Sequence, residues 1–122
     1  MSASEVAKSV SDGKGPGKVE GMTRFVAEHY TEPVRVADVA LSVGLHPNYA
    51  LTLFRRALGI RTVEYITQHR VLHAQRLLAT TVASVLEVAL AAGFGSPNRF
   101  YTVFRSDFAC MPREYRALVR TP

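Results

Sequence analysis

Two stretches decide the fold: Asp38-Val39-Ala40-Leu41-Ser42-Val43-Gly44-Leu45 and Glu87-Val88-Ala89-Leu90-Ala91-Ala92-Gly93-Phe94. Each has an acidic residue, then an apolar residue and an alanine, and finally a glycine that precedes a large apolar residue. The match continues past the glycine, where the second copy has one extra residue, through these pairs: Pro47-Asn48 and Pro97-Asn98, Thr52 and Thr102, and Phe54-Arg55 and Phe104-Arg105. A match at so many spaced positions indicates that one structural motif has been duplicated.

Both copies fit a helix-turn-helix motif, in which two short helices pack at a steep angle. Ala40 and Ala89 supply the small residue that the first helix needs where the second helix crosses it. Gly44 and Gly93 supply the turn, because glycine adopts a positive φ without steric cost. Apolar residues recur at helical spacing on both sides of each turn, which supports the assignment.

The remaining sequence is also helical in its pattern, and we predict an all-α, homeodomain-like fold of about seven helices. Residues 1–17 are small, polar and glycine-rich, which is typical of a flexible linker or leader. Residues 18–60 form the first expected helix-turn-helix subdomain, residues 61–80 a linker helix, and residues 81–122 the second subdomain. The expected helices are residues 18–30, 36–43, 47–58, 62–79, 82–92, 97–108 and 113–116.

The charge balance favours a nucleic-acid partner. The formal net charge is +5, and every Lys or Arg after Lys18 is an arginine. An excess of arginine on a small domain suits contact with phosphates, although many other soluble proteins are mildly basic. Cys110 is the only cysteine, so no internal disulfide can form, which fits a reducing cytoplasm. No apolar run approaches the roughly 18 residues of a membrane helix, and no signal-peptide pattern is present, so we expect a cytoplasmic protein.

Residues 19–118 resemble the C-terminal DNA-binding domain of the AraC/XylS family of bacterial transcription regulators. The two duplicated stretches carry the resemblance, together with Phe54-Arg55-Arg56 and Gly59. The most specific match is Pro112-Arg113-Glu114-Tyr115-Arg116. Within the family, three segments resemble the subgroup of melibiose-operon regulators: Asn48-Tyr49-Ala50, Tyr65-Ile66-Thr67 and Ser96 with Arg99-Phe100-Tyr101.

Several positions depart from the family pattern. Ala109 stands where the family usually has a glycine, and Met111 stands where it usually has the serine or threonine that caps the last helix. Losing that cap costs about 1 kcal/mol. Thr52 and Thr102 stand where arginine is common. The resemblance therefore implies the docking mode and transfers no base preference. It also implies a structural salt bridge for Arg70.

The resemblance implies a sequence-specific transcription regulator, an activator, that inserts two recognition helices into adjacent major grooves of double-stranded DNA. It also implies RNA polymerase as a partner, and a small-molecule effector that binds an N-terminal domain absent from this chain. The linker-like residues 1–17 fit a piece cut from a longer protein, and a short regulator that stands alone is the other possibility.

Two other classes of function stay open. One is the DNA-binding module of an alkyl-transfer DNA-repair protein, which would also need a cysteine-rich zinc module, whereas Cys110 stands alone. The other is a protein-interaction module that keeps the helical fold and has lost DNA binding.

The candidates for reading bases lie on the outer face of the second helix of each motif. Asparagine can bond adenine in two places, arginine can bond guanine N7 and O6, and threonine or leucine can contact a thymine methyl. The plainer interpretation is that the asparagines cap helix starts and the arginine is solvated. Leu51 and Tyr101 could instead complete the core. The base-reading candidates are Asn48, Leu51, Thr52, Asn98, Arg99 and Thr102.

Other arginines are candidates for phosphate contacts, which give position and affinity without reading sequence. Any one of them could simply be solvated. These candidates are Arg55, Arg56, Arg61, Arg105 and Arg113.

No residue pattern indicates catalysis or a cofactor. His69 and His73 have the spacing of a two-histidine metal edge, but no Cys, Asp or Glu completes it. We therefore interpret both as solvated residues of the long helix. No nucleophile–base pair, phosphate-cradling loop or carboxylate pair is present. We expect a DNA-binding protein without enzymatic activity, cofactor or metal.

Overall fold

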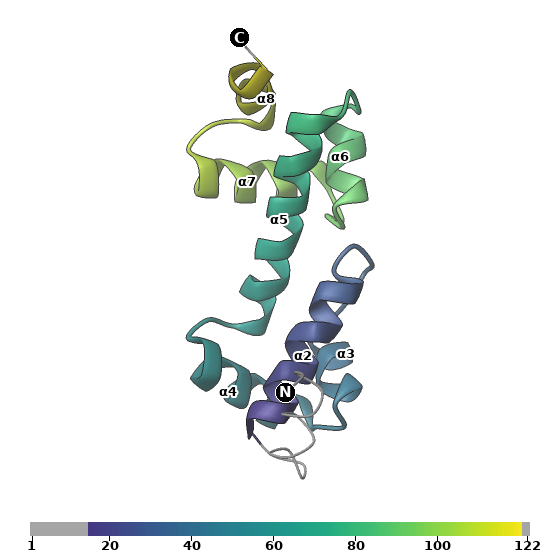
Figure 1. Cartoon of the computed structure of the whole chain (residues 1–122), viewed down its shortest axis with the longest axis vertical. Coiled ribbons are helices and arrows are strands. Elements are labelled where there is room, and N and C mark those ends of the chain that lie inside the picture. Colours follow the sequence, from purple (N-terminus) through teal and green to yellow (C-terminus); the bar gives the residue numbers. More distant parts are fainter. Residues whose placement is uncertain (1–14, 121–122) are drawn as a thin grey trace, which may run out of the picture. The chain divides into compact units, whose positions relative to one another are not determined.

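The structure, a computed structural model, describes residues 15–120. Within this range the chain is all-α (Figure 1), which confirms the predicted fold class. None of the helices described is long and apolar enough to cross a membrane. In chain order the helices are α2 (Gly15–His29), α3 (Val36–Ser42), α4 (Pro47–Leu58), α5 (Thr62–Thr80), α6 (Val85–Ala91), α7 (Pro97–Phe108) and α8 (Pro112–Arg120).

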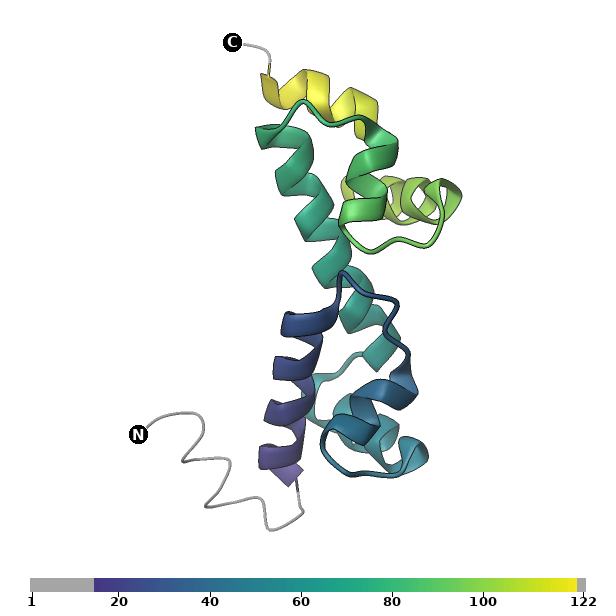
Figure 2. The same ribbon diagram turned by 90° about the vertical axis from the view of Figure 1, so that its right-hand side faces the viewer.

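The chain divides into two compact units, which we call the first and the second unit. Of the described residues, the first unit contains residues 15–29 and Val34–Ile66. The second unit contains Tyr30–Pro33 and the residues from Thr67 onward. Each unit has one helix-turn-helix motif, formed by α3 and α4 in the first and by α6 and α7 in the second (Figure 2).

The core of the first unit involves α2, α3 and α4. Met22 of α2 is fully buried. Helix α2 approaches the end of α3 so closely that a Cβ atom on Gly21 would lie 2.7 Å from Val43 Cγ1. Lys18 secures this approach, because its Nζ donates a hydrogen bond of 2.7 Å to the Val43 carbonyl. The other buried apolar residues of this unit are Val19, Val26, Val39, Ala40, Ala50, Phe54 and Ile66.

The core of the second unit is an aromatic cluster packed on α5. Phe100 and Phe104 of α7 are fully buried, with ring centroids 5.6 Å apart. Phe104 also meets Tyr115 of α8 edge-on, at a centroid distance of 5.4 Å. Arg116 ties α8 to the end of α5, because its Nε donates to the Leu78 carbonyl over 3.1 Å. The other buried residues of the cluster are Val71, Ala74, Leu78, Val88, Ala89, Ala92 and Phe94.

Both turn glycines have the positive φ that the repeat predicts. The φ angle is 70° at Gly44 and 101° at Gly93, which confirms both turn assignments. Their surroundings differ. A Cβ atom on Gly44 would meet nothing within 4 Å, whereas one on Gly93 would lie 2.5 Å from the Tyr30 carbonyl oxygen. Glycine is therefore required by conformation alone at the first turn, and by both conformation and space at the second.

Helices α2 and α8 are longer than predicted. Helix α2 begins at Gly15, so the end of the predicted 1–17 linker is helical; residues 1–14 lie outside the described residues. Pro16 fits there because the first N–H groups of a helix have no acceptor within it. Helix α8 continues to Arg120, beyond the predicted end at residue 116. Arg116 and Arg120 both donate to the Thr81 carbonyl, which anchors the added turn.

Helix α6 begins later than predicted, at Val85 instead of residue 82, because Ser84 caps it. Ser84 Oγ accepts from the Glu87 N–H over 3.1 Å, and the Ser84 N–H donates to the Glu87 carboxylate over 2.9 Å. This reciprocal pair is a capping box, which stops the helix from starting earlier. At α8 the missing cap is partly replaced, since the Glu114 carboxylate accepts from the Met111 N–H over 3.0 Å.

Helices α4 and α7 end alike, in a residue with left-handed backbone. Gly59 has φ 77° and Ala109 has φ 59°. Their N–H groups donate to the carbonyls of Arg55 and Arg105, over 2.8 and 2.9 Å. A non-glycine residue in this region costs roughly 1–2 kcal/mol. The alanine at position 109, where the family has glycine, therefore introduces local backbone strain.

Candidate nucleic-acid interface

The second helices of the two motifs, α4 and α7, are built alike. Each is 12 residues long and has a proline in its first turn. His46 caps α4, because its Nδ1 accepts from the Asn48 N–H over 3.2 Å. Ser96 caps α7, because its Oγ accepts from the Arg99 N–H over 3.2 Å. The side chains of Asn48 and Asn98 are therefore not needed as caps.

The base-reading candidates all lie exposed on these two helices. Leu51 and Tyr101, which the sequence left open, differ: Leu51 is 38% exposed, whereas Tyr101 packs against the core of the second unit. Tyr49 occupies the position in the first motif that Arg99 occupies in the second, and it is 50% exposed. Sequence reasoning missed Tyr49, although aligning the two copies would have found it. The exposed candidates are Asn48, Leu51 and Thr52 on α4, and Asn98, Arg99 and Thr102 on α7.

The two threonines make the same internal hydrogen bond. Thr52 Oγ1 donates to the Asn48 carbonyl over 3.1 Å, and Thr102 Oγ1 donates to the Asn98 carbonyl over 3.0 Å. The hydroxyl hydrogen of each threonine is therefore already used. What each threonine can offer a ligand is its methyl group and a hydroxyl oxygen that accepts.

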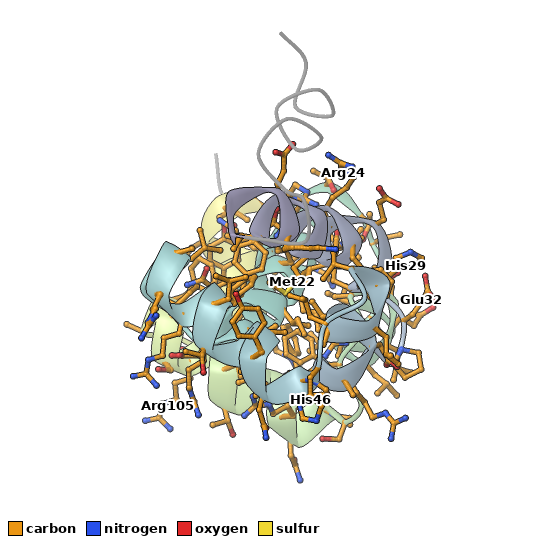
Figure 3. All side chains as sticks on the ribbon, turned by 90° about the horizontal axis from the view of Figure 1, so that it is seen from below. Met22, Arg24, His29, Glu32, His46 and Arg105 are labelled. Carbon is orange, nitrogen blue, oxygen red and sulfur yellow. The ribbon has the colours of Figure 1, made fainter. Side chains whose placement is uncertain are left out.

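The phosphate-contact candidates are exposed as well, and Figure 3 shows Arg105 at the periphery. Arg61 is the one candidate for which the structure records an ion pair: its Nε lies 3.2 Å from Glu64 Oε1. Hydrogen bonds from the Arg61 backbone, and then from its side chain, lower the pKa of Glu64. A phosphate would compete with this carboxylate for Arg61. The remaining candidates are Arg55 and Arg56 on α4, Arg105 on α7 and Arg113 on α8.

A hollow lies beside the second helix of each motif, at matching positions of the repeat. Val36, Leu51 and Arg61 line the first hollow, and the residues at the same places in the second copy, Val85, Tyr101 and Met111, line the second. The volumes are about 450 Å³ in the first unit and about 290 Å³ in the second. The other lining residues are Thr52, Arg55 and Val63 in the first, and Pro112, Arg113 and Glu114 in the second.

His69 and His73 are not the solvated residues that we expected, because they pack around Tyr30. The Tyr30 hydroxyl lies 2.7 Å from His73 Nδ1, and the ring of Tyr30 lies 5.3 Å from that of His69. Burial, and then the positive charge of Arg76, lower the pKa of both histidines. Across residues 15–120, no group of three or more potential metal ligands is present.

Arg70 makes two hydrogen bonds to backbone carbonyls, and the salt bridge that the resemblance implies stays a prediction. Its Nε donates to the Tyr30 carbonyl over 2.7 Å, and its second amino group donates to the Glu32 carbonyl over 2.9 Å. Burial, and then the charge of Arg99, lower the pKa of Arg70. The guanidinium stays protonated at any physiological pH. Arg70 therefore holds the backbone of residues 30–32.

Comparison with known proteins finds relatives that share this architecture. Residues 39–118 match the model of a family described as a helix-turn-helix domain. The chain is 40% identical over 100 residues to the melibiose operon regulatory protein of Escherichia coli strain K12, covering 82% of this chain and 33% of that protein. It is also similar to the DNA-binding domain of AdpA, a global transcriptional factor solved with a target DNA, with 32% identity, a TM-score of 0.80, and 88% and 95% of the two chains covered.

A second solved structure agrees. It is a transcriptional regulator from Chromobacterium violaceum described as having an AraC-type DNA-binding domain; identity is 30%, the TM-score is 0.77, and 86% and 94% of the two chains are covered. The chain spans about a third of the length of the curated relatives it matches, but nearly all of these two solved chains. The chain belongs to the AraC/XylS family of DNA-binding transcription regulators, and it contains the helix-turn-helix DNA-binding domain of that family.

Proposed function

We propose that α4 and α7 both enter the major groove of one DNA duplex, in adjacent turns, and that the protein activates transcription from this site. The observation that carries the proposal is a matched exposed set: Asn48 with Asn98 and Thr52 with Thr102, at equivalent positions of two helices of equal length. Exposed polar residues have no packing reason to be duplicated. Two recognition helices that read related half-sites would need such a set.

Each outward residue has a role that its chemistry suits. Asn48 and Asn98 would bond adenine, and Arg99 would bond guanine. The threonine hydroxyls are engaged with backbone carbonyls, so Thr52 and Thr102 would present their methyl groups to thymine. Leu51, also exposed, would contact a thymine methyl in the first half-site.

Phosphate contacts would come from the arginines around the two hollows. Arg55 and Arg61 line the first hollow, and Arg113 lines the second. We propose that a deoxyribose rests on the apolar floor of each hollow while an arginine neutralises the adjoining phosphate. Arg56 and Arg105, which are exposed near the ends of α4 and α7, would add two further contacts.

For the organisation of the chain, we propose that residues 18–60 and 81–122 each supply one recognition helix and that residues 61–80 connect them. The protein would act in the cytoplasm and contact RNA polymerase. A small-molecule effector would act through an N-terminal domain outside this chain. The cytoplasmic location, the polymerase contact and the effector are supported only by membership of the family.

A selection of bound duplexes from a random pool, followed by gel shifts over a salt series, tests the proposal. The logarithm of affinity should fall with the logarithm of salt by about 0.9 per neutralised phosphate. Arg105→Ala should weaken all sequences alike and flatten this slope by about one, whereas Arg99→Ala should cost about 1–3 kcal/mol at a single base pair. Binding that ignores salt would contradict the proposal, and a chain that binds no duplex would favour the protein-interaction alternative.

The spacing of the half-sites tests the two-groove model separately. We expect them about 10–10.5 base pairs apart, on one face of the duplex. Inserting about five base pairs turns one half-site to the opposite face, so affinity should fall toward that of a single motif. Thr102→Ala should then cost little on the spaced duplex. Full affinity there, with both motifs still contributing, would refute the model.

A further inference from the structure

The second unit contains a piece of chain that the repeat does not predict. Residues Tyr30–Pro33 follow α2 and precede α3, and both of these helices belong to the first unit. Residues Tyr30–Pro33 nevertheless belong to the second unit. We call Tyr30–Pro33 the inserted loop.

The inserted loop is held on α5 by hydrogen bonds to its backbone and to one of its side chains. Arg70 donates to its carbonyls at Tyr30 and Glu32, over 2.7 and 2.9 Å. The Tyr30 hydroxyl pairs with His73 Nδ1 over 2.7 Å, and its ring meets that of His69. Charge-assisted bonds to a guanidinium are among the stronger hydrogen bonds in proteins. Both backbone and side chain of the loop are thus fixed on α5.

The inserted loop also packs against the turn of the second motif. A Cβ atom on Gly93 would lie 2.5 Å from the Tyr30 carbonyl oxygen and 3.0 Å from Thr31 Cα. At Gly44, the equivalent glycine of the first motif, a Cβ atom would meet nothing within 4 Å. The two copies of the motif therefore differ in what stands behind the turn.

The turn leads directly into the recognition helix α7. Phe94, the residue after Gly93, is buried, and its ring lies 5.1 Å from that of Phe100 in α7. Ser96 then caps the helix. A shift of Gly93 would therefore be passed to the start of α7, where the candidates Asn98 and Arg99 lie.

We propose that the inserted loop is a positioning element for the second recognition helix, with Tyr30 and Arg70 as its positioning residues. Reading of DNA by α7 then depends on chain supplied from between α2 and α3, whereas the turn before α4 is held by α2, through the hydrogen bond from Lys18 to the Val43 carbonyl. For its DNA-binding consequence, the inference rests on the proposed function.

Binding to three duplexes tests the inference, with the full chain throughout. The first duplex is one selected by the wild-type chain from a random pool, and in the other two either half-site is scrambled. Sensitivity to Thr52→Ala and Thr102→Ala assigns each half-site to its motif. Arg70→Met removes both donors, Tyr30→Phe removes only a hydroxyl, and Arg76→Met is the control, an exposed arginine on the same helix.

Arg70→Met should weaken the intact duplex, and the duplex that keeps only the second half-site, by about tenfold, the effect of one lost base contact. Binding to the duplex that keeps only the first half-site should be unchanged. Tyr30→Phe should give the same pattern with a smaller loss, and Arg76→Met should weaken all three duplexes alike, if at all. An equal loss on all three duplexes with Arg70→Met, or no loss on any, would overturn the inference.

Amide hydrogen exchange of the free chain tests the positioning without DNA. Arg70→Met should speed exchange at residues 92–96 and leave residues 43–45 unchanged. Unchanged exchange at residues 92–96 would overturn the inference even if DNA binding fell. If the wild-type chain binds no duplex, the proposed function fails, and this exchange measurement still decides whether the loop supports the turn.

Discussion

Alanine at the two turn glycines should cost unequal amounts of stability, because the positions differ in space as well as in backbone conformation. Gly44→Ala adds a Cβ atom at φ 70° with nothing within 4 Å. It should therefore lose only the penalty of a left-handed residue, about 1–2 kcal/mol. Gly93→Ala has a φ of 101°, farther from the left-handed well, so its backbone penalty is at least as large, and it also places its Cβ atom 2.5 Å from the Tyr30 carbonyl oxygen.

That second contact cannot be relieved by a side-chain rotation, because the neighbouring atom is backbone. The loop must move, and the hydrogen bond of 2.7 Å from Arg70 Nε to the Tyr30 carbonyl is then lost or stretched. Hydrogen bonds to charged groups contribute about 1.5–3 kcal/mol. Gly93→Ala should therefore cost about 3–5 kcal/mol in total, roughly 2 kcal/mol more than Gly44→Ala.

Urea unfolding followed by far-ultraviolet circular dichroism measures both losses. With a slope of about 1.5 kcal/mol per molar urea, the two midpoints should differ by about 1.3 M. In an Arg70→Met background the excess cost of Gly93→Ala should shrink, because the hydrogen bond is already absent. Equal shifts at Gly44 and Gly93 would refute the close approach of the loop to the second turn.

Three further outcomes are expected. Ala109→Gly should raise the free energy of unfolding by about 1 kcal/mol, and Gly59→Ala should lower it by a similar amount, because both positions have a positive φ. A urea midpoint that Ala109→Gly leaves unchanged would contradict the backbone strain at Ala109. In gel shifts, Thr102→Val should keep the affinity for a thymine-containing site, and Thr102→Ser should lose it. Replacing that thymine by uracil should abolish the difference between the two variants. If Thr102→Ser binds more tightly than Thr102→Val, the hydroxyl makes the contact instead. Because burial lowers the pKa of His69 and His73 below 6.5, their contribution to stability is complete above about pH 6.5 and is lost as the pH falls through the lowered values. His73→Gln should flatten this decline in urea midpoints between pH 7 and pH 5, and an unchanged decline would exclude His73 as a source.

The parts of the fold with local signatures could be predicted from the sequence. Helices α4 and α7 begin and end at the predicted residues, because a proline opens each one, a glycine follows α4, and α7 is the matching copy of α4 in the repeat. Gly44 and Gly93 were identifiable as turns because the two copies of the motif match around them. The outward position of Thr52 and Thr102 follows from helical periodicity once the core face is known.

The parts that depend on distant contacts could not be predicted. Arg70 and Tyr30 are 40 residues apart, and nothing near either residue in the sequence indicates their hydrogen bond. His69 and His73 were interpreted as solvated for the same reason, since their partner lies in a loop before α3. Leu51 and Tyr101 occupy one position of the repeat, yet only the packing of each unit decides which side chain is exposed.

The inserted loop also affects the order in which the chain folds during its synthesis. At roughly 5–20 residues per second, Arg70 is made some 2–8 s after Tyr30, and Gly93 roughly 3–13 s after it. The first unit needs no residue beyond Ile66, so its motif can fold while the carbonyls of the loop are still hydrated. The second unit contains Tyr30–Pro33, which are made early, and the residues from Thr67 onward, which are made late. It can therefore fold only after the later residues have been synthesised. On the ribosome, the two helix-turn-helix motifs should therefore form one after the other, although the finished chain carries them as a matched pair.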